Sequence, residues 1–178
     1  DQASPNDSGT YSMRAYIDAA MGDTAGAIKD LDRAIALAPD RLDLYEQRAV
    51  AYTKLGEAAL ATADWRRVLA EPPKTAGEYN DQAWTLATNP LAEVRNGKQA
   101  VELATQSCKL SGWKDGEYLD TLAAAYAEQG NFADAILWEK KAIAALAPSQ
   151  NRLAPEMRDR LALYQAGHPY RDSDPSLF

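Results

Sequence analysis

Residues 118–142 read YLDTLAAAYAEQGNFADAILWEKKA, and the rest of the chain is organised around them. Apolar residues recur at helical spacing in both halves, and this spacing predicts two amphipathic helices. Between them, Gly130 can end the first helix without a Cβ penalty, and Asn131 is suited to cap the second. The apolar stripe of the second helix needs partners on two sides, so the hairpin must stack against neighbouring hairpins.

Imperfect copies of this hairpin precede it with a period of 34 residues. The landmarks Ala15, Gly22, Ala27, Leu31, Ala34 and Pro39 recur as Ala49, Gly56, Ala61, Trp65, Val68 and Pro73. We therefore predict four repeats, which span residues 8–41, 42–75, 76–115 and 116–149. The third repeat is longer, because Ala100 follows Ala61 by 39 residues instead of 34, so the loop 89–97 contains five additional residues.

Two further segments flank the repeats. Residues 1–7 are interpreted as a linker or a mature N-terminus, and residues 150–178 as a capping helix with a tail. The helix is predicted over residues 155–165, with apolar residues on one face and arginines elsewhere. Such a helix covers the apolar face that a stack of hairpins exposes at its end. We expect the second helix of the fourth repeat to pack against it near Leu161.

The period of 34, with small residues at fixed positions, a glycine between the helices and a proline after the second, resembles the tetratricopeptide repeat (TPR) family. The third and fourth repeats resemble a narrower subset found in bacterial proteins. The matching segments are NDQAWTLAT at residues 80–88, RNGKQAV at 95–101, WKD at 113–115, LDTLAAAYAE at 119–128 and the ending LALYQAGHPYR at 161–171. The resemblance implies an all-α fold, a right-handed α-solenoid of about four TPR helical hairpins plus a C-terminal capping helix.

The charge balance narrows the class of partner. The chain has 178 residues, with 19 Lys and Arg against 26 Asp and Glu, and a formal net charge of −7. This balance argues against nucleic acid, whose phosphates reward clustered basic residues, and against anionic membrane surfaces. No apolar run approaches the ~18 residues needed to cross a bilayer, so membrane insertion is not expected. A basic or neutral protein partner fits better than an acidic one.

Cysteine usage and the first residues bear on the compartment. The single cysteine, Cys108, excludes an internal disulfide framework and thiolate metal clusters. We expect a buried, inert thiol, which is acceptable in either redox compartment. Because the chain begins with Asp1 and a small-polar stretch, and not with Met, export to the periplasm is favoured over a cytoplasmic location.

In TPR proteins the first helix of each hairpin lines a concave surface, so the resemblance implies a binding groove. The positions that it carries over are Ser12 and Tyr16 in the first repeat, Glu46, Val50 and Lys54 in the second, Asn80 and Trp84 in the third, and Asp120, Ala124 and Glu128 in the fourth. Lys54 is the only basic residue among them, so the groove departs from that of TPR domains that bind acidic C-terminal peptides. A basic or neutral protein or peptide is again favoured.

Three of these positions have a second interpretation. Trp84 is either an aromatic anchor for a partner or packs against the first helix of the next repeat. Asn80 and Asp120 are expected to be neighbours, because they occupy equivalent positions in adjacent first helices. They could offer acceptors to a ligand backbone. A structural bond that fixes the inserted loop, through Arg95, is the favoured alternative.

No catalytic or cofactor motif is present in the sequence. It contains no phosphate-binding loop, nucleophile elbow or zinc-binding helix, so we expect no metal and no cofactor. The only histidine, His168, lies just past a predicted helix end, where a turn accounts for it. Carboxylates that alternate with basic residues predict a solvated face: Asp30, Asp32, Asp64, Glu71, Glu102, Asp134 and Glu139. Aromatic residues at repeat positions predict core packing: Tyr45, Tyr52, Trp65, Tyr126 and Trp138.

The sequence therefore predicts a TPR scaffold, not an enzyme, that binds a protein or peptide in its concave groove. Two structural roles remain open as the alternative. The chain could self-associate as a homo-oligomer, or it could be an accessory domain of a larger, catalytic protein.

Overall fold

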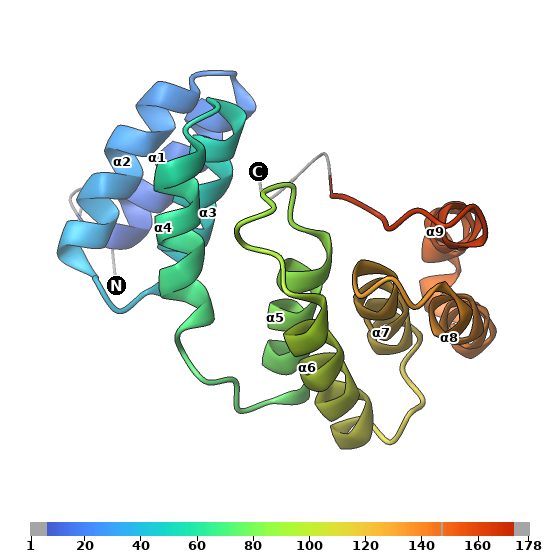
Figure 1. Cartoon of the computed structure of the whole chain (residues 1–178). Helices are drawn as coiled ribbons and strands as arrows, with labels where there is room; N and C mark the ends of the chain where they lie inside the picture. Colours follow the sequence, from blue (N-terminus) through green and yellow to red (C-terminus); the bar gives the residue numbers. More distant parts are fainter. Residues whose placement is uncertain (1–6, 147, 173–178) are drawn as a thin grey trace. The chain divides into compact units, whose positions relative to one another are not determined.

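The computed structural model describes residues 7–146 and 148–172, and within these ranges all regular structure is helical. The helices, which are labelled in Figure 1, are α1 (Ser8–Ala20), α2 (Thr24–Leu37), α3 (Leu42–Lys54), α4 (Ala58–Leu69), α5 (Ala76–Thr88), α6 (Gly97–Leu110), α7 (Gly116–Glu128), α8 (Phe132–Ala145), a 3-10 helix η1 (Pro148–Leu153) and α9 (Ala154–Gln165). The predicted all-α fold class is confirmed.

Local sequence accounts for the turns inside the hairpins. Gly130 takes a positive φ of 82°, and the Asn131 side chain accepts a hydrogen bond from the backbone N–H of Asp134 at 3.3 Å. This is the turn and cap that the sequence predicts between α7 and α8. The third hairpin differs, because the chain leaves α5 at Asn89 in an extended conformation and enters α6 only after Asn96. The longer loop predicted there is present.

The chain divides into two compact units, and the division falls between Pro72 and Pro73. The described part of the first unit, residues 7–72, contains α1 to α4. Each of these helices packs against the next one along the chain. Small residues let the helix backbones approach closely. The core cluster of this unit consists of Ala15, Ala27, Leu31, Ala34 and Leu44.

A ladder of arginine–aspartate ion pairs crosses the first unit. Arg14 of α1 binds Asp30 of α2 through two of its guanidinium nitrogens. Arg48 of α3 repeats this arrangement with Asp64 of α4, and both hydrogen bonds are 2.8 Å long. Arg48 also binds Asp32 at 2.6 Å, and this third contact ties the second hairpin to the first.

Asp30 and Asp64 are therefore not part of a solvated face, and the prediction for these two residues is wrong. They are only 5% and 6% exposed. Alternating charges identify the polar side of a helix, but they do not reveal that an arginine of the preceding helix covers it. Hydrogen bonding to Arg14 lowers the pKa of the Asp30 carboxyl, so the acid stays ionised inside the hairpin.

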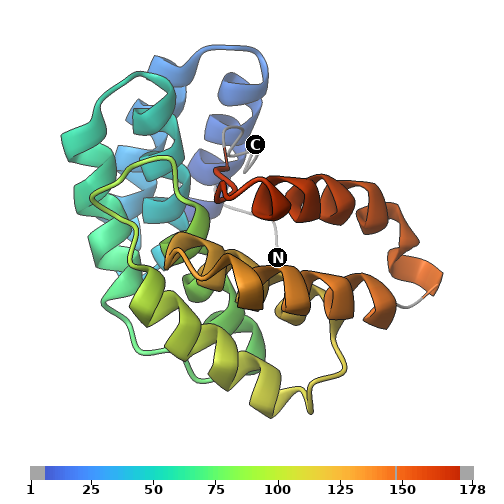
Figure 2. The ribbon, with the colours of Figure 1, turned by 45° about the vertical axis from the view of Figure 1, so that its right-hand side comes forward.

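The second unit contains α5 to α9, with α7 at its centre, because α7 packs against α5, α6 and α8. Helix α9 lies alongside α8, as Figure 2 shows. The predicted packing of the capping helix on the fourth hairpin is thus confirmed. Its central residue is the fully buried Tyr164 and not Leu161. Tyr164 joins a buried cluster with Ala123, Ala127 and Ala135.

Replacing Arg48 by Leu should lower the free energy of unfolding by about 3 kcal/mol, because Asp64 would stay buried without its ion partner. Replacing both residues by Leu should recover most of that loss, since the buried charge is then absent as well. The fourth repeat already carries Leu122 and Trp138 at the two equivalent positions. Urea unfolding followed by circular dichroism measures both variants. A double variant as unstable as the single one would contradict this account.

Candidate functional site

A buried ion pair joins α9 to α7 in the second unit. Arg160 Nε donates to Asp120 Oδ1 at 2.9 Å, and Arg160 Nη2 donates to Asp120 Oδ2 at 2.7 Å. Both residues are less than a tenth exposed. A bidentate pair of this kind fixes the orientation of both side chains and thereby sets where α9 sits on α7. Asp120, a predicted groove residue, uses both of its carboxylate oxygens to hold the capping helix.

Glu139 of α8 lies beside this ion pair and is fully buried. Neither of its carboxyl oxygens has a hydrogen-bond donor among the described residues. Burial raises the pKa of Glu139 to about 10, and the neighbouring Asp120 carboxylate acts in the same direction. Glu139 is therefore a neutral acid at pH 7, and its proton can point at Asp120. The prediction that Glu139 belongs to a solvated face is wrong, because α9 covers it.

Trp84 of α5 packs on the C-terminal part of the chain. Its ring centroid lies 5.9 Å from that of Tyr170, with the two rings tilted by 41°. The Arg160 guanidinium carbon lies 5.4 Å from the centroid of each of these rings. One arginine thus contacts a carboxylate and two aromatic faces. The partners of Trp84 described here come from α9 and the segment after it, which neither sequence interpretation anticipated.

A pocket of about 190 Å3 lies next to the ion pair. Its lining comprises Asn80, Trp84, Glu117, Asp120, Thr121, Leu153, Glu156, Met157 and Arg160. The structure therefore brings Asn80 and Asp120 to one site, as their equivalent positions predict. Asn80 does not share the bond that holds Asp120. Its Oδ1 atom is buried and has no hydrogen-bond partner within the described residues.

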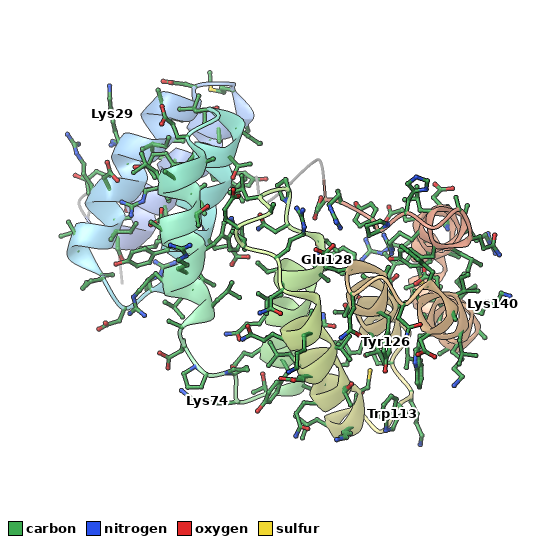
Figure 3. The ribbon with its side chains drawn as sticks, in the orientation of Figure 1. Lys29, Lys74, Trp113, Tyr126, Glu128 and Lys140 are labelled. Atoms are coloured by element: carbon green, nitrogen blue, oxygen red, sulfur yellow. The ribbon has the colours of Figure 1, made fainter. Side chains whose placement is uncertain are left out.

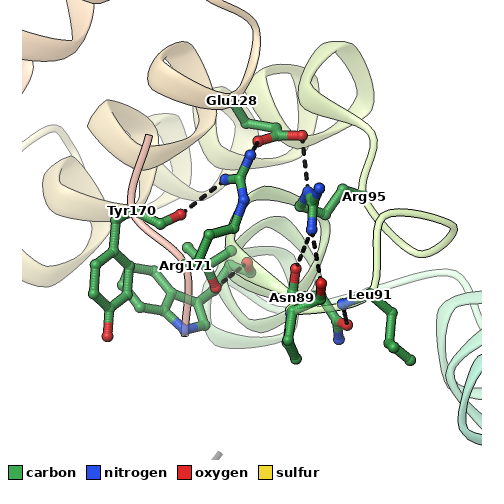
Figure 4. A network of polar contacts seen from close by, with 9 residues as sticks. Asn89, Leu91, Arg95, Glu128, Tyr170 and Arg171 are labelled. Atoms are coloured by element: carbon green, nitrogen blue, oxygen red, sulfur yellow. Dashed lines mark hydrogen bonds and ion pairs between the residues drawn. The ribbon is translucent and has the colours of Figure 1, made fainter. Parts of the chain in front are cut away.

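Arg95 fixes the inserted loop, but it does so through Glu128 and not through Asn80 or Asp120. Arg95 Nη1 donates to the carbonyl oxygens of Asn89 and Pro90 at 2.8 and 3.0 Å. Its Nε donates to Glu128 Oε1 at 3.1 Å. Figure 4 shows this network, in which the guanidinium closes the loop against the C-terminal end of α7.

The segment that follows α9 crosses α7 and α5, and we call residues 168–172 the tail segment. Arg171 Nη2 lies 2.5 Å from Glu128 Oε2, the carboxylate that Arg95 also holds (Figure 4). The Asp172 backbone N–H donates to the carbonyl oxygen of Thr88, the last residue of α5, at 2.9 Å. With Tyr170 on Trp84, three consecutive tail residues contact the first helices of the third and fourth hairpins. The motif LALYQAGHPYR at residues 161–171 is the only part of the sequence pattern that drew attention to this segment.

The predicted groove residues of the first unit have different environments. Tyr16 is 48% exposed, Lys54 is exposed and Glu46 is partly buried. Val50 is only 1% exposed, so its side chain is inaccessible and we no longer expect it to contact a partner. Its helix, α3, packs against both α2 and α4. Ser12 of α1 donates a hydrogen bond to the Gln47 side chain of α3 at 3.2 Å.

The remaining reactive side chains have structural surroundings. Cys108 is fully buried, as expected, and burial raises the pKa of its thiol to about 12, which disfavours the reactive thiolate. The backbone N–H of His168 closes the turn after α9 by donating to the Leu163 carbonyl at 3.0 Å. Residues 7–146 and 148–172 contain no cluster of three or more His, Cys, Asp or Glu side chains that could hold a metal ion. No helix in that part of the chain is long and apolar enough to cross a membrane.

Solved structures with a similar fold include two of MamA. The one described as the crystal structure of MamA protein has 17% sequence identity and a TM-score of 0.54, over 90% of this chain and 88% of that chain. A MamA structure labelled AMB-1 has 18% identity and a TM-score of 0.51, over 90% and 85% of the two chains. The TPR domain of Sgt2 from Aspergillus fumigatus aligns over 95% of this chain and 89% of that chain, with 15% identity and a lower TM-score of 0.30.

No protein-family profile matches the chain, and no curated protein does. The structural comparisons establish the fold, which is a TPR-like helical repeat of the α-solenoid class. The narrower bacterial subset remains a prediction from the sequence.

Replacing Glu139 by Gln should stabilise the chain at alkaline pH relative to the wild type. The folded chain holds the Glu139 proton up to a pKa of about 10, whereas the ordinary value of a glutamate is 4.5. The folded state therefore binds more protons than the unfolded chain between these values, and stability falls as the pH rises through this window. Glutamine has no proton to lose, so the stability difference in favour of the variant should grow with pH.

Urea unfolding at a series of pH values from about 5 to 9 measures this difference. Glu102→Gln, which changes an exposed carboxyl in α6, is the matched control and should show no such trend. Parallel pH profiles for the wild type and Glu139→Gln would show that Glu139 is ionised in the folded chain, against this assignment.

Proposed function

We propose that the chain is a non-catalytic scaffold that binds a protein or peptide through the exposed side of its first helices. The TPR-like fold supports this proposal, because stacked helical hairpins present an extended surface to other chains. One observation carries it further. In the second unit, residues 170–172 already lie across α5 and α7 and contact them through a ring, a charged side chain and a backbone N–H. The same helices offer a partner these three kinds of contact.

A basic or neutral partner suits the charges of this surface. Glu117 and Glu156 are both exposed and line the pocket beside the ion pair. The carboxylate of Glu128 already holds two guanidinium groups. Together with a net charge of −7, these acids favour a partner that supplies Lys or Arg and disfavour an acidic peptide.

Self-association is the second candidate, and a separate surface supports it. Trp113 is a large apolar side chain that is 40% exposed. Trp113, marked in Figure 3, stacks on Trp138 with ring centroids 5.2 Å apart. The two rings border a hollow of about 390 Å3 whose lining also includes Lys141. A second copy of the chain could cover this surface.

Replacing Trp84 by Ala should weaken binding of a partner captured from the source cell by at least about tenfold, because a central tryptophan is the kind of side chain on which interfaces depend. Trp113→Ala is the matched control, since it removes a partly exposed tryptophan of the second candidate surface. Fluorescence anisotropy with the identified partner measures both affinities, and circular dichroism confirms that helicity is retained.

The opposite pattern would contradict the proposal. If Trp113→Ala abolishes partner binding or a concentration-dependent dimer seen by sedimentation, and Trp84→Ala changes neither, the surface of α5 and α7 is not the binding surface.

A further inference from the structure

The tail segment makes a different kind of contact at each of three consecutive residues. Tyr170 places its ring on Trp84, Arg171 pairs with Glu128, and the Asp172 backbone N–H reaches the Thr88 carbonyl. None of these residues lies in a regular helix, and together they form an irregular segment that runs over two helices. This is how an extended peptide is commonly recognised: side chains supply selectivity and the backbone supplies register.

The surface beneath the tail segment offers partners for such a segment, and we call Trp84, Thr88 and Glu128 the tail surface. The Thr88 carbonyl is one of the last four carbonyls of α5, which have no partner inside their own helix, so it accepts a donor from outside. The Glu128 carboxylate is held by Arg95 through Oε1, which leaves Oε2 directed at the second guanidinium. Arg95 therefore holds the Glu128 carboxylate independently of the tail segment.

Helix α9 has buried anchors besides its contacts with the tail segment. Arg160, Met157 and Tyr164 anchor it, and the last two are almost completely buried. After α9 the chain turns at Gly167, which has a φ of 76° and separates the helix from the tail. The Arg171 side chain remains 33% exposed, so water competes for its ion pair. The tail segment can consequently leave its surface while α9 stays in position.

We propose that the tail surface binds an extended aromatic–arginine segment of a partner protein, and that Tyr170 and Arg171 occupy it as a built-in competitor. This inference rests on the proposed function and specifies the chemistry of its partner. An aromatic ring would replace Tyr170 on Trp84, and a guanidinium would replace Arg171 at Glu128. The tail segment is part of the same chain and is tethered close to the tail surface, so its effective concentration there is in the millimolar range. A partner must therefore offer further contacts to displace it.

The neighbouring pocket supplies those further contacts and favours a foreign segment over the tail of a second copy. The pocket of about 190 Å3 shares Trp84 with the tail surface, and the buried Asn80 Oδ1 in its lining lacks a donor among the residues described. A partner residue with an ammonium group beyond the aromatic ring could enter this pocket, whose lining includes the exposed carboxylates of Glu117 and Glu156. The tail of a second copy would repeat the existing contacts and gain nothing over the tethered one.

A labelled synthetic peptide with the sequence of residues 166–172 (AGHPYRD) tests the surface directly. The full chain with Tyr170→Ala and Arg171→Ala, whose tail surface is emptied, should bind this peptide at least tenfold more tightly than the wild type. Adding Glu128→Gln to that variant should reverse the gain. A peptide with Glu in place of its Arg should bind neither chain. Fluorescence anisotropy gives the affinities, and thermal unfolding verifies that all chains are folded.

Equal peptide affinities for the wild type and the emptied variant would overturn the inference, and so would binding that ignores the peptide arginine. A wild-type dimer that disappears in the emptied variant would also overturn it, because the occupant would then be a second copy. These results are separable from the proposed function. If Trp84→Ala abolishes binding of a native partner but the peptide test fails, the proposed function stands. Only the aromatic–arginine chemistry of the partner is then wrong.

Discussion

The buried ion pair between Asp120 and Arg160 is the constraint that positions α9 and the tail segment in the second unit. It joins the first helix of the last hairpin to the helix that closes the unit, and both of its hydrogen bonds are buried. Beside it, Glu139 is buried, and neither of its carboxyl oxygens has a hydrogen-bond partner among the described residues, so it is tolerated as a neutral acid. One cation, one anion and one protonated carboxyl thus form a buried cluster with no net charge. Removing a single charged member leaves its partner buried and unpaired, which is costly.

The same arginine connects this cluster to the candidate binding surface. Arg160 lies against the rings of Trp84 and Tyr170 while its nitrogens hold Asp120. The position of α9 therefore sets where the chain can turn back over α7 and α5, and the tail segment follows from that. Residues 170–172 of the same chain cross the surface that the TPR resemblance implies for a ligand. Stability of the closing helix and access to the surface are separate properties, since α9 has its own buried anchors.

Helix spacing and capping rules predicted the helices and turns, which depend on local sequence. They did not predict the burial of side chains whose partners lie far away in the chain. The period of 34, the turn at Gly130 and the helix of residues 155–165 follow from spacing and capping. The burial of Glu139 does not, because a carboxyl followed by two lysines has the same pattern whether or not another helix covers it. The ladder of arginine–aspartate ion pairs in the first unit could have been predicted from the sequence. Arg14 and Arg48 are one period apart, as are Asp30 and Asp64, and a recurring opposite-charge pair indicates a repeated contact. No comparable repeat existed for Arg160, which belongs to the capping helix.

The dependence of the tail segment on the Asp120–Arg160 pair is tested most directly by hydrogen exchange at one amide. The Asp172 N–H, bonded to the Thr88 carbonyl, reports whether the tail segment is seated. In a chain with Asp120→Leu and Arg160→Met, no buried charge is left unpaired, and α5 and α7 should keep their protection. The account predicts that the Asp172 amide then exchanges at least tenfold faster than in the wild type. Unchanged protection of Asp172 in that folded variant would show that the ion pair does not position the tail segment.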